Sequence, residues 1–262
     1  MRELRGLCYL AWLTCRRQVW ARKTIVAAIL IIMLTMATAI WTQRGDFLRE
    51  PNEAVRLTMQ LSFMTNTVVV RLFVSFLLPI LVLTYATAAI GEQREDRTLV
   101  YTLIRPLSRW RIYLATALGI LPLVLLVTLG GFAMVCSAGG QAGGLAWDNY
   151  WPAILLAALT YCALFLLFGA AFPRPVIMAV VYAFLIEALL GGMPGTIKRL
   201  AVSFYANSMI YQQAALYDVK PELPQFQSIP SQSAMFYLGI ISLALFLIGA
   251  VWFQRREYRD LA

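Results

Sequence analysis

The residue types that support catalysis are scarce in this sequence. It contains no His, which is the commonest metal ligand and the commonest base near neutral pH. No G-x-x-x-x-G-K-[ST] motif is present, so the chain has no P-loop for ATP. We expect no catalytic residue, no metal site and no cofactor in this chain. Four cysteines in apolar or interfacial sequence, without a CxxC pair, are expected to be small buried side chains: Cys8, Cys15, Cys136 and Cys162.

Charged residues cluster instead in residues 91–111, where acidic side chains come first and basic side chains last. A short apolar stripe at helical spacing lies between them and predicts an amphipathic helix. Pro106 would end this helix, and Ser108 could cap the next one. A short charged helix offers a surface to a partner protein; the alternative is a solvated loop that only fixes topology. The stripe consists of Leu99, Leu103 and Ile104.

Glu187 is the only acidic residue inside a predicted membrane span. A charge in hydrocarbon costs about 3 kcal/mol or more unless it is paired or neutralised. The favoured interpretation is an intramembrane ion pair with Arg71, Lys198 or Arg199, which would hold the outer segment down. The alternative is substrate contact or proton handling near the outer side.

The elements that must position these residues are membrane helices. The chain is 61% hydrophobic and 13% charged, with a mean hydropathy of +0.72. A bilayer span needs about 20 mostly apolar residues. Such stretches are apolar on every side here, which favours helices over a barrel of alternating strands. We predict an all-α polytopic membrane protein, one transmembrane domain over residues 1–262, with six spans at about 24–41, 68–90, 112–137, 151–172, 176–190 and 234–253.

The segments between the spans complete this topology. Residues 1–23 are predicted to form an interfacial helix, residues 91–111 a cytoplasmic segment, and residues 193–233 an outer segment. With both termini in the cytoplasm, 15 of the 22 Lys and Arg residues lie on the cytoplasmic side. This bias accounts for the net charge of +9 without a nucleic-acid partner.

Three local features of the spans are also predicted. Residues 54–66 form a short helix that returns to the membrane. Pro79 lies inside the second span and kinks it. Residues 139–144 contain two GxxxG spacings, which can pack helices, but we favour a flexible outer turn.

The charged segment resembles the loop between the second and third spans of ABC-2 type exporter permeases of the ABC transporter superfamily. The shared pattern is an acidic residue, Thr-Leu, a hydrophobic pair, Pro and then Ser-Arg, and the layout of the whole chain agrees as well. Two positions depart from the family: Arg97 stands where a Gly is common, and a Lys common after Ser-Arg is replaced, with Thr116 near that place. The matching residues are Glu92, Glu95, Thr98, Leu99, Leu103, Pro106, Ser108 and Arg109.

The resemblance implies a permease that works with a separate ATPase subunit, which binds ATP and Mg²⁺. It also implies two copies of this chain as a homodimer in the inner (plasma) membrane of a bacterium, in contact with lipid. The pathway would lie between the copies, lined by the first, second and fifth spans, and some family members use an accessory protein. The residues expected to dock on the ATPase are Glu92, Glu95, Arg97, Thr98, Arg105, Pro106 and Arg109.

Two other classes of membrane protein fit the sequence less well. A secondary transporter or a structural membrane partner would need neither an ATPase nor a coupling helix, and no internal repeat is evident in the sequence. An intramembrane enzyme would need paired catalytic groups at membrane depth, whereas this chain offers one carboxylate and no His. The sequence does not identify a substrate.

Overall fold

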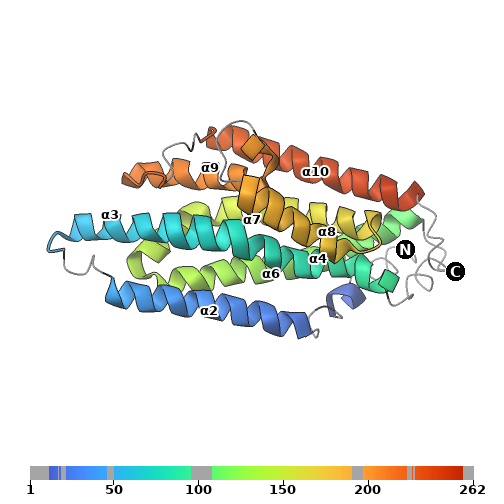
Figure 1. Cartoon of the computed structure of the whole chain (residues 1–262), viewed down its shortest axis with the longest axis horizontal. Coiled ribbons are helices and arrows are strands. Elements are labelled where there is room, and N and C mark those ends of the chain that lie inside the picture. Colours follow the sequence, from blue (N-terminus) through green and yellow to red (C-terminus); the bar gives the residue numbers. More distant parts are fainter. Residues whose placement is uncertain are drawn as a thin grey trace.

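The computed structural model describes residues 12–16, 18, 22–45, 50–95, 108–190, 197–222, 226 and 228–255, and every regular element within these ranges is a helix. The helices form an elongated bundle (Figure 1). In chain order they are α2 (Arg22–Arg44), α3 (Glu53–Phe63), η2 (Met64–Leu77), α4 (Leu78–Glu95), α6 (Arg109–Ala138), α7 (Gly140–Ala171), α8 (Pro175–Val181), η3 (Tyr182–Leu190), η4 (Ile197–Leu200), α9 (Val202–Ala214), η5 (Ala215–Tyr217) and α10 (Ser231–Arg255).

Five of the described helices are long and apolar enough to cross a membrane: Lys23–Arg44, Glu53–Glu92, Arg109–Ala138, Gly140–Ala171 and Ser231–Arg255. They correspond to the first, second, third, fourth and sixth predicted spans. The fifth predicted span, residues 176–190, forms α8 and η3, and its apolar helix Pro175–Glu187 is shorter than the other five. At 1.5 Å per residue that helix covers about 20 Å, less than the roughly 30 Å of a hydrocarbon core. The described residues therefore support five of the six predicted spans.

The predicted N-terminal helix lies mostly outside the described residues. Residues 12–16 and 18 are helical, and nothing further of residues 1–21 is described, so the interfacial helix over residues 1–23 stays a prediction. Residues 96–107 and 191–196 are also outside, so the structure describes only parts of the two predicted segments 91–111 and 193–233.

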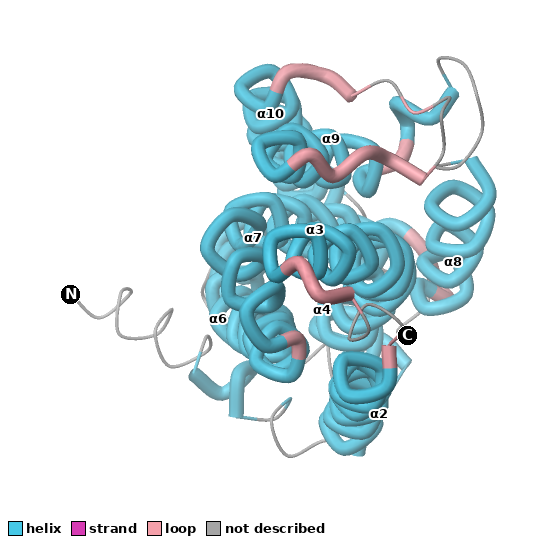
Figure 2. The backbone as a smooth tube through the Cα atoms, turned by 90° about the vertical axis from the view of Figure 1, so that its left-hand side faces the viewer, coloured by secondary structure: helices cyan, strands magenta, loops and turns pink. Residues whose placement is uncertain are grey.

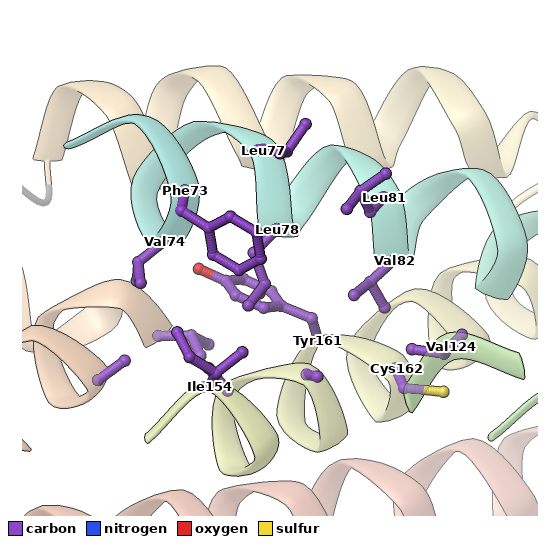
Figure 3. Close-up of a cluster of buried hydrophobic side chains, with 14 of the residues drawn as sticks. Phe73, Val74, Leu77, Leu78, Leu81, Val82, Val124, Ile154, Tyr161 and Cys162 are labelled. Atoms are coloured by element: carbon purple, nitrogen blue, oxygen red, sulfur yellow. The ribbon is translucent and has the colours of Figure 1, made fainter. Parts of the chain in front are cut away.

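Helix α7 lies at the centre of the bundle, in contact with α4, α6, α9 and α10 (Figure 2). In its most apolar stretch 72% of the residues are buried, against 17% in α2 and 17% in α10. The contact between α7 and the helix formed by η2 and α4 is a buried, mostly apolar cluster that includes Phe73, Leu78, Ile154 and Tyr161 (Figure 3). The outward faces of α2 and α10 remain apolar, so they suit lipid or another membrane subunit.

Residues 53–95 form one continuous helix rather than a short helix followed by a separate span. Its middle part, η2, is a π-helix that ends two residues before Pro79. Proline lacks an N–H group, and its ring clashes with the carbonyl four residues earlier. The wider π-helical turns upstream accommodate this defect, and the predicted kink at Pro79 stays a prediction.

The prediction of a flexible turn over residues 139–144 is wrong in extent. α6 ends at Ala138 and α7 begins at Gly140, so the connection is Gly139 alone. Gly140 has a φ of 60°, which glycine adopts without strain. A Cβ on Gly143 would overlap the carbonyl oxygen of Cys136. The glycines therefore permit a close reversal between two long helices, whereas their number in the sequence suggested a longer loop.

The bundle has two different ends (Figure 1). At one end lie the Gly139 connection and the last residues of α2 and α9; we call it the turn end. At the other lie the start of α2, the last turn of α4, the start of α6, the α7–α8 connection and the last turn of α10. We call it the basic end, because its side chains include Lys23, Arg109, Arg111, Arg174 and Arg255.

Candidate functional site

The basic end holds both boundaries of the predicted docking segment. Glu92 and Glu95 lie in the last turn of α4, and Arg109 opens α6, which packs against α4. The remaining predicted docking residues lie outside the described residues: Arg97, Thr98, Arg105 and Pro106. The fold therefore delivers both ends of the segment to one end of the bundle, as a docking surface requires.

Glu92 forms an ion pair within the chain. The Nζ atom of Lys23, at the start of α2, lies 2.8 Å from Oε1 of Glu92. The Lys23 side chain is 16% exposed and that of Glu92 is 41% exposed. Such a partly solvated pair stabilises the fold by about 1 kcal/mol or less. Its geometric effect is to connect the first helix to the end of the second, beside the docking segment.

The start of α6 presents cationic and aromatic side chains. Ser108 occupies the N-cap position, as predicted, with extended backbone angles, but its side chain makes no capping hydrogen bond. The guanidinium of Arg111 lies 5.6 Å from the centre of the Trp110 ring, and Trp110 is 44% exposed. Positive charge at a helix N-terminus opposes the helix dipole, so Arg109 and Arg111 gain no stabilisation from the dipole of α6.

Glu187 lies in η3 and is 2% exposed. Its Oε1 accepts hydrogen bonds from the backbone N–H of Val202 at 2.8 Å and from the Tyr182 hydroxyl at 3.0 Å, and its Oε2 accepts one from the N–H of Ser203 at 3.1 Å. Val202 and Ser203 are the first residues of α9, which begins midway along the bundle (Figure 1). The first N–H groups of a helix have no partner within the helix, and in an apolar interior no water supplies one. Glu187 therefore caps α9.

The ion pair expected for Glu187 is not formed with any of its three candidate partners in the described structure. Lys198 is 8% exposed, and its Nζ lies over the rings of Phe204 and Phe226 at 5.2 and 5.4 Å. Arg71 and Arg199 have exposed side chains. The physical reason is that the helix N-terminus already supplies the positive potential that the sequence interpretation sought in a side chain.

Asn66 forms a second polar junction, which the sequence interpretation missed. Its amide nitrogen donates to the carbonyl oxygens of Ser62 and Lys220, and its Oδ1 accepts from the Tyr211 hydroxyl at 2.8 Å and from the N–H of Glu222 at 3.3 Å. The available signal was an Asn, flanked by Thr65 and Thr67, at the start of an apolar run, since such a residue needs partners in a membrane helix. Asn66 joins the long second helix to the chain after α9.

The comparisons with known proteins agree with this architecture. The family model described as ABC-2 family transporter protein matches residues 9–258, nearly the whole chain. No curated protein matches the chain significantly. With a match of this extent over a bundle of apolar, membrane-length helices, the chain belongs to the ABC-2 transporter family and is a multi-pass membrane protein.

Proposed function

We propose that this chain is the membrane-spanning subunit of an ATP-driven exporter, and that a separate subunit binds and hydrolyses ATP with Mg²⁺. The observation that carries the proposal is the family match over residues 9–258, since ABC-2 permeases in general work with an ATPase. The absence of a P-loop from the sequence fits this division of labour.

The basic end would face the cytoplasm, following the excess of Lys and Arg on the cytoplasmic side of membrane proteins. The first residues of α2 and the last residues of α10 lie at this end, which is consistent with both chain termini in the cytoplasm (Figure 1). α8 and η3 would start the fifth crossing at the basic end, and α9 would continue from the middle of the bundle to the turn end. The inner membrane of a bacterial cell is the expected location.

A second copy of the chain would complete the pathway. The outward faces of α2 and α8 carry large exposed apolar side chains, among them Ile29, Met33, Ile177 and Val181. In the proposed homodimer such faces would meet across the pathway, and ATP-driven closure of the two ATPase subunits would alternate its access between the two sides. The apolar character of the chain suits lipid-like or hydrophobic cargo.

The docking surface would consist of the ends of α4 and α6 with the segment between them. Its residues would be Glu92, Glu95, Arg97, Thr98, Arg105, Pro106 and Arg109. Because Lys23 pairs with one oxygen of Glu92, we assign Glu95 and the arginines to direct contact and Glu92 to the connection between α2 and the docking segment.

The test is a charge reversal at the docking segment of the assembled complex. Glu92→Lys with Glu95→Lys should release the ATPase on purification or abolish the stimulation of ATP hydrolysis by the permease. The matched control is Glu53→Lys, a reversal at an exposed carboxylate at the start of α3, at the turn end, which should leave both unchanged. If stimulation survives the double substitution, the docking assignment is wrong. If no ATPase is retained by the unmodified chain after gentle solubilisation, the exporter proposal itself fails.

A further inference from the structure

A cavity of about 220 Å³ lies at the basic end, between the first residues of α2, the last turns of α4 and the start of α8. It is separate from the start of α6. Its described lining consists of Lys23, Leu83, Thr84, Thr87, Ala88, Gly91, Glu92, Pro175 and Val176.

One wall of the cavity is a close contact between α4 and α8. A Cβ on Gly91 would lie 2.6 Å from Cγ of Pro175, so the two helices touch at this point and only glycine fits. Beyond this contact the outward faces of α2 and α8 are apolar, with Val26 55% exposed and Val176 46% exposed. The cavity therefore joins charged side chains at a helix end to apolar surface that would face hydrocarbon. This is the place where a lipid headgroup meets its acyl chains.

The polar groups of this described lining are one cation and several acceptors. Lys23 and Glu92 supply an ammonium and a carboxylate that already pair with each other. The hydroxyls of Thr84 and Thr87 donate their hydrogens to the backbone carbonyls of Leu81 and Leu83, each at 2.7 Å. Thr87 is 1% exposed, so of the two threonines it is Thr84 that offers a lone pair to a ligand. A matching ligand carries an anion for Lys23 and an N–H donor for Thr84 and Glu92.

We propose that this cavity binds the headgroup of a phospholipid with a primary ammonium, of the phosphatidylethanolamine type. The phosphate lies next to Lys23, and the ammonium donates to Glu92 and to the Thr84 hydroxyl oxygen. A choline headgroup has no N–H to donate, and a glycerol headgroup has no cation for Glu92, so both fit less well. This inference requires only that the basic end lies at a membrane surface, and it does not depend on an ATPase partner.

The experiment measures which lipid the purified full-length chain retains. The protein is exchanged into micelles that contain equal amounts of phosphatidylethanolamine, phosphatidylcholine and phosphatidylglycerol, and bound lipid is identified by native mass spectrometry. We expect the ethanolamine lipid to be enriched about tenfold over the choline lipid, as for one or two additional hydrogen bonds. Equal retention of the two, or a preference for phosphatidylglycerol, would overturn the proposal.

Two variants locate the site. Val176→Trp fills the mouth of the cavity and should abolish the enrichment, whereas Ile177→Trp, on the same helix and 54% exposed but outside the described lining, should leave it intact. Thr84→Val should lower the ethanolamine-to-choline ratio without altering any charge, and Glu92 should retain part of the preference. Enrichment that persists unchanged both in the Val176→Trp variant and in the Thr84→Val variant would place the lipid elsewhere and refute the assignment.

Discussion

The two ends of the bundle are built from different interactions. At the turn end, and at the midway start of α9, polar side chains bond to backbone groups: Glu187 is buried and Asn66 is half-buried. At the basic end, charges lie on partly exposed side chains, and Lys23–Glu92 is the close ion pair that the structure describes there. The chain thus uses these side chains to bond its own backbone at one end, whereas at the other its charged side chains are partly exposed. Variants at the two ends should therefore differ in what they damage.

The largest effect on stability is expected from Gly143→Ala. Its Cβ would overlap the Cys136 carbonyl oxygen, so the α6–α7 reversal would have to open. We expect a loss of about 3 kcal/mol or more in the free energy of unfolding, measured by thermal or denaturant unfolding in detergent.

Gly144→Ala is the matched control, since nothing lies within 4 Å of its Cβ position. In the interior of α7 it should stabilise by up to about 1 kcal/mol through helix propensity. Equal effects of the two neighbouring substitutions would contradict the tight reversal.

Glu187→Gln should come second, at about 2 kcal/mol. The amide retains one acceptor, so one of the two N–H groups at the start of α9 loses its partner inside the protein. The measurement compares unfolding midpoints with Glu222→Gln, whose side chain is exposed and which should change little. Transport that is unchanged while stability falls would exclude a substrate role for Glu187; lost transport at full stability would contradict the capping role.

Tyr211→Phe should cost about 1 kcal/mol, because it removes one of the four hydrogen bonds to the Asn66 side-chain amide that lie within 3.3 Å. Asn66→Ala removes all four and should cost more. A protease-accessibility assay of residues 217–222 distinguishes a local loss at this junction from global unfolding, since the junction fixes Lys220 and Glu222. A Tyr211→Phe protein with unchanged stability and accessibility would show that the junction does not hold this segment.

The smallest effect is expected at Lys23–Glu92. A double-mutant cycle with Lys23→Gln and Glu92→Gln should give a coupling energy of about 1 kcal/mol or less, and it should weaken further as salt is added. A coupling of several kcal/mol would mean that polar groups at the basic end are bonded within the chain as strongly as those at the turn end. It would remove the distinction between the two ends.

Much of this fold could be predicted because hydropathy reports transmembrane helices directly. The five long spans follow from runs of apolar residues. The helices that flank the predicted segment 91–111 end at Glu95 and begin at Arg109, a few residues inside its predicted bounds. The Gly139 reversal and the continuous helix from Glu53 were not predicted. Glycine content and polar residues between apolar runs do not show whether a neighbouring backbone approaches closely.

The candidate sites were harder to predict. The sequence marked Glu187 as a residue that needs a partner. Its partners include the backbone amides of Val202 and Ser203, which could not be predicted because almost every residue type carries a backbone N–H. Asn66 was overlooked for the converse reason, since an uncharged polar residue raises less suspicion than a charge. The type of side chain shows that a hydrogen-bond partner is needed, but the path of the backbone determines which group becomes that partner.

The long π segment η2 has a mechanical consequence for the helix that contains it. A π-helix places more residues in each turn than an α-helix does, so rewinding any part of Met64–Leu77 turns one end of the helix about its axis relative to the other. Glu95 lies on one side of this segment and Glu53 on the other. A torque applied at the basic end would therefore reach the turn end through a change of hydrogen-bonding register, without a hinge and without a break in the helix.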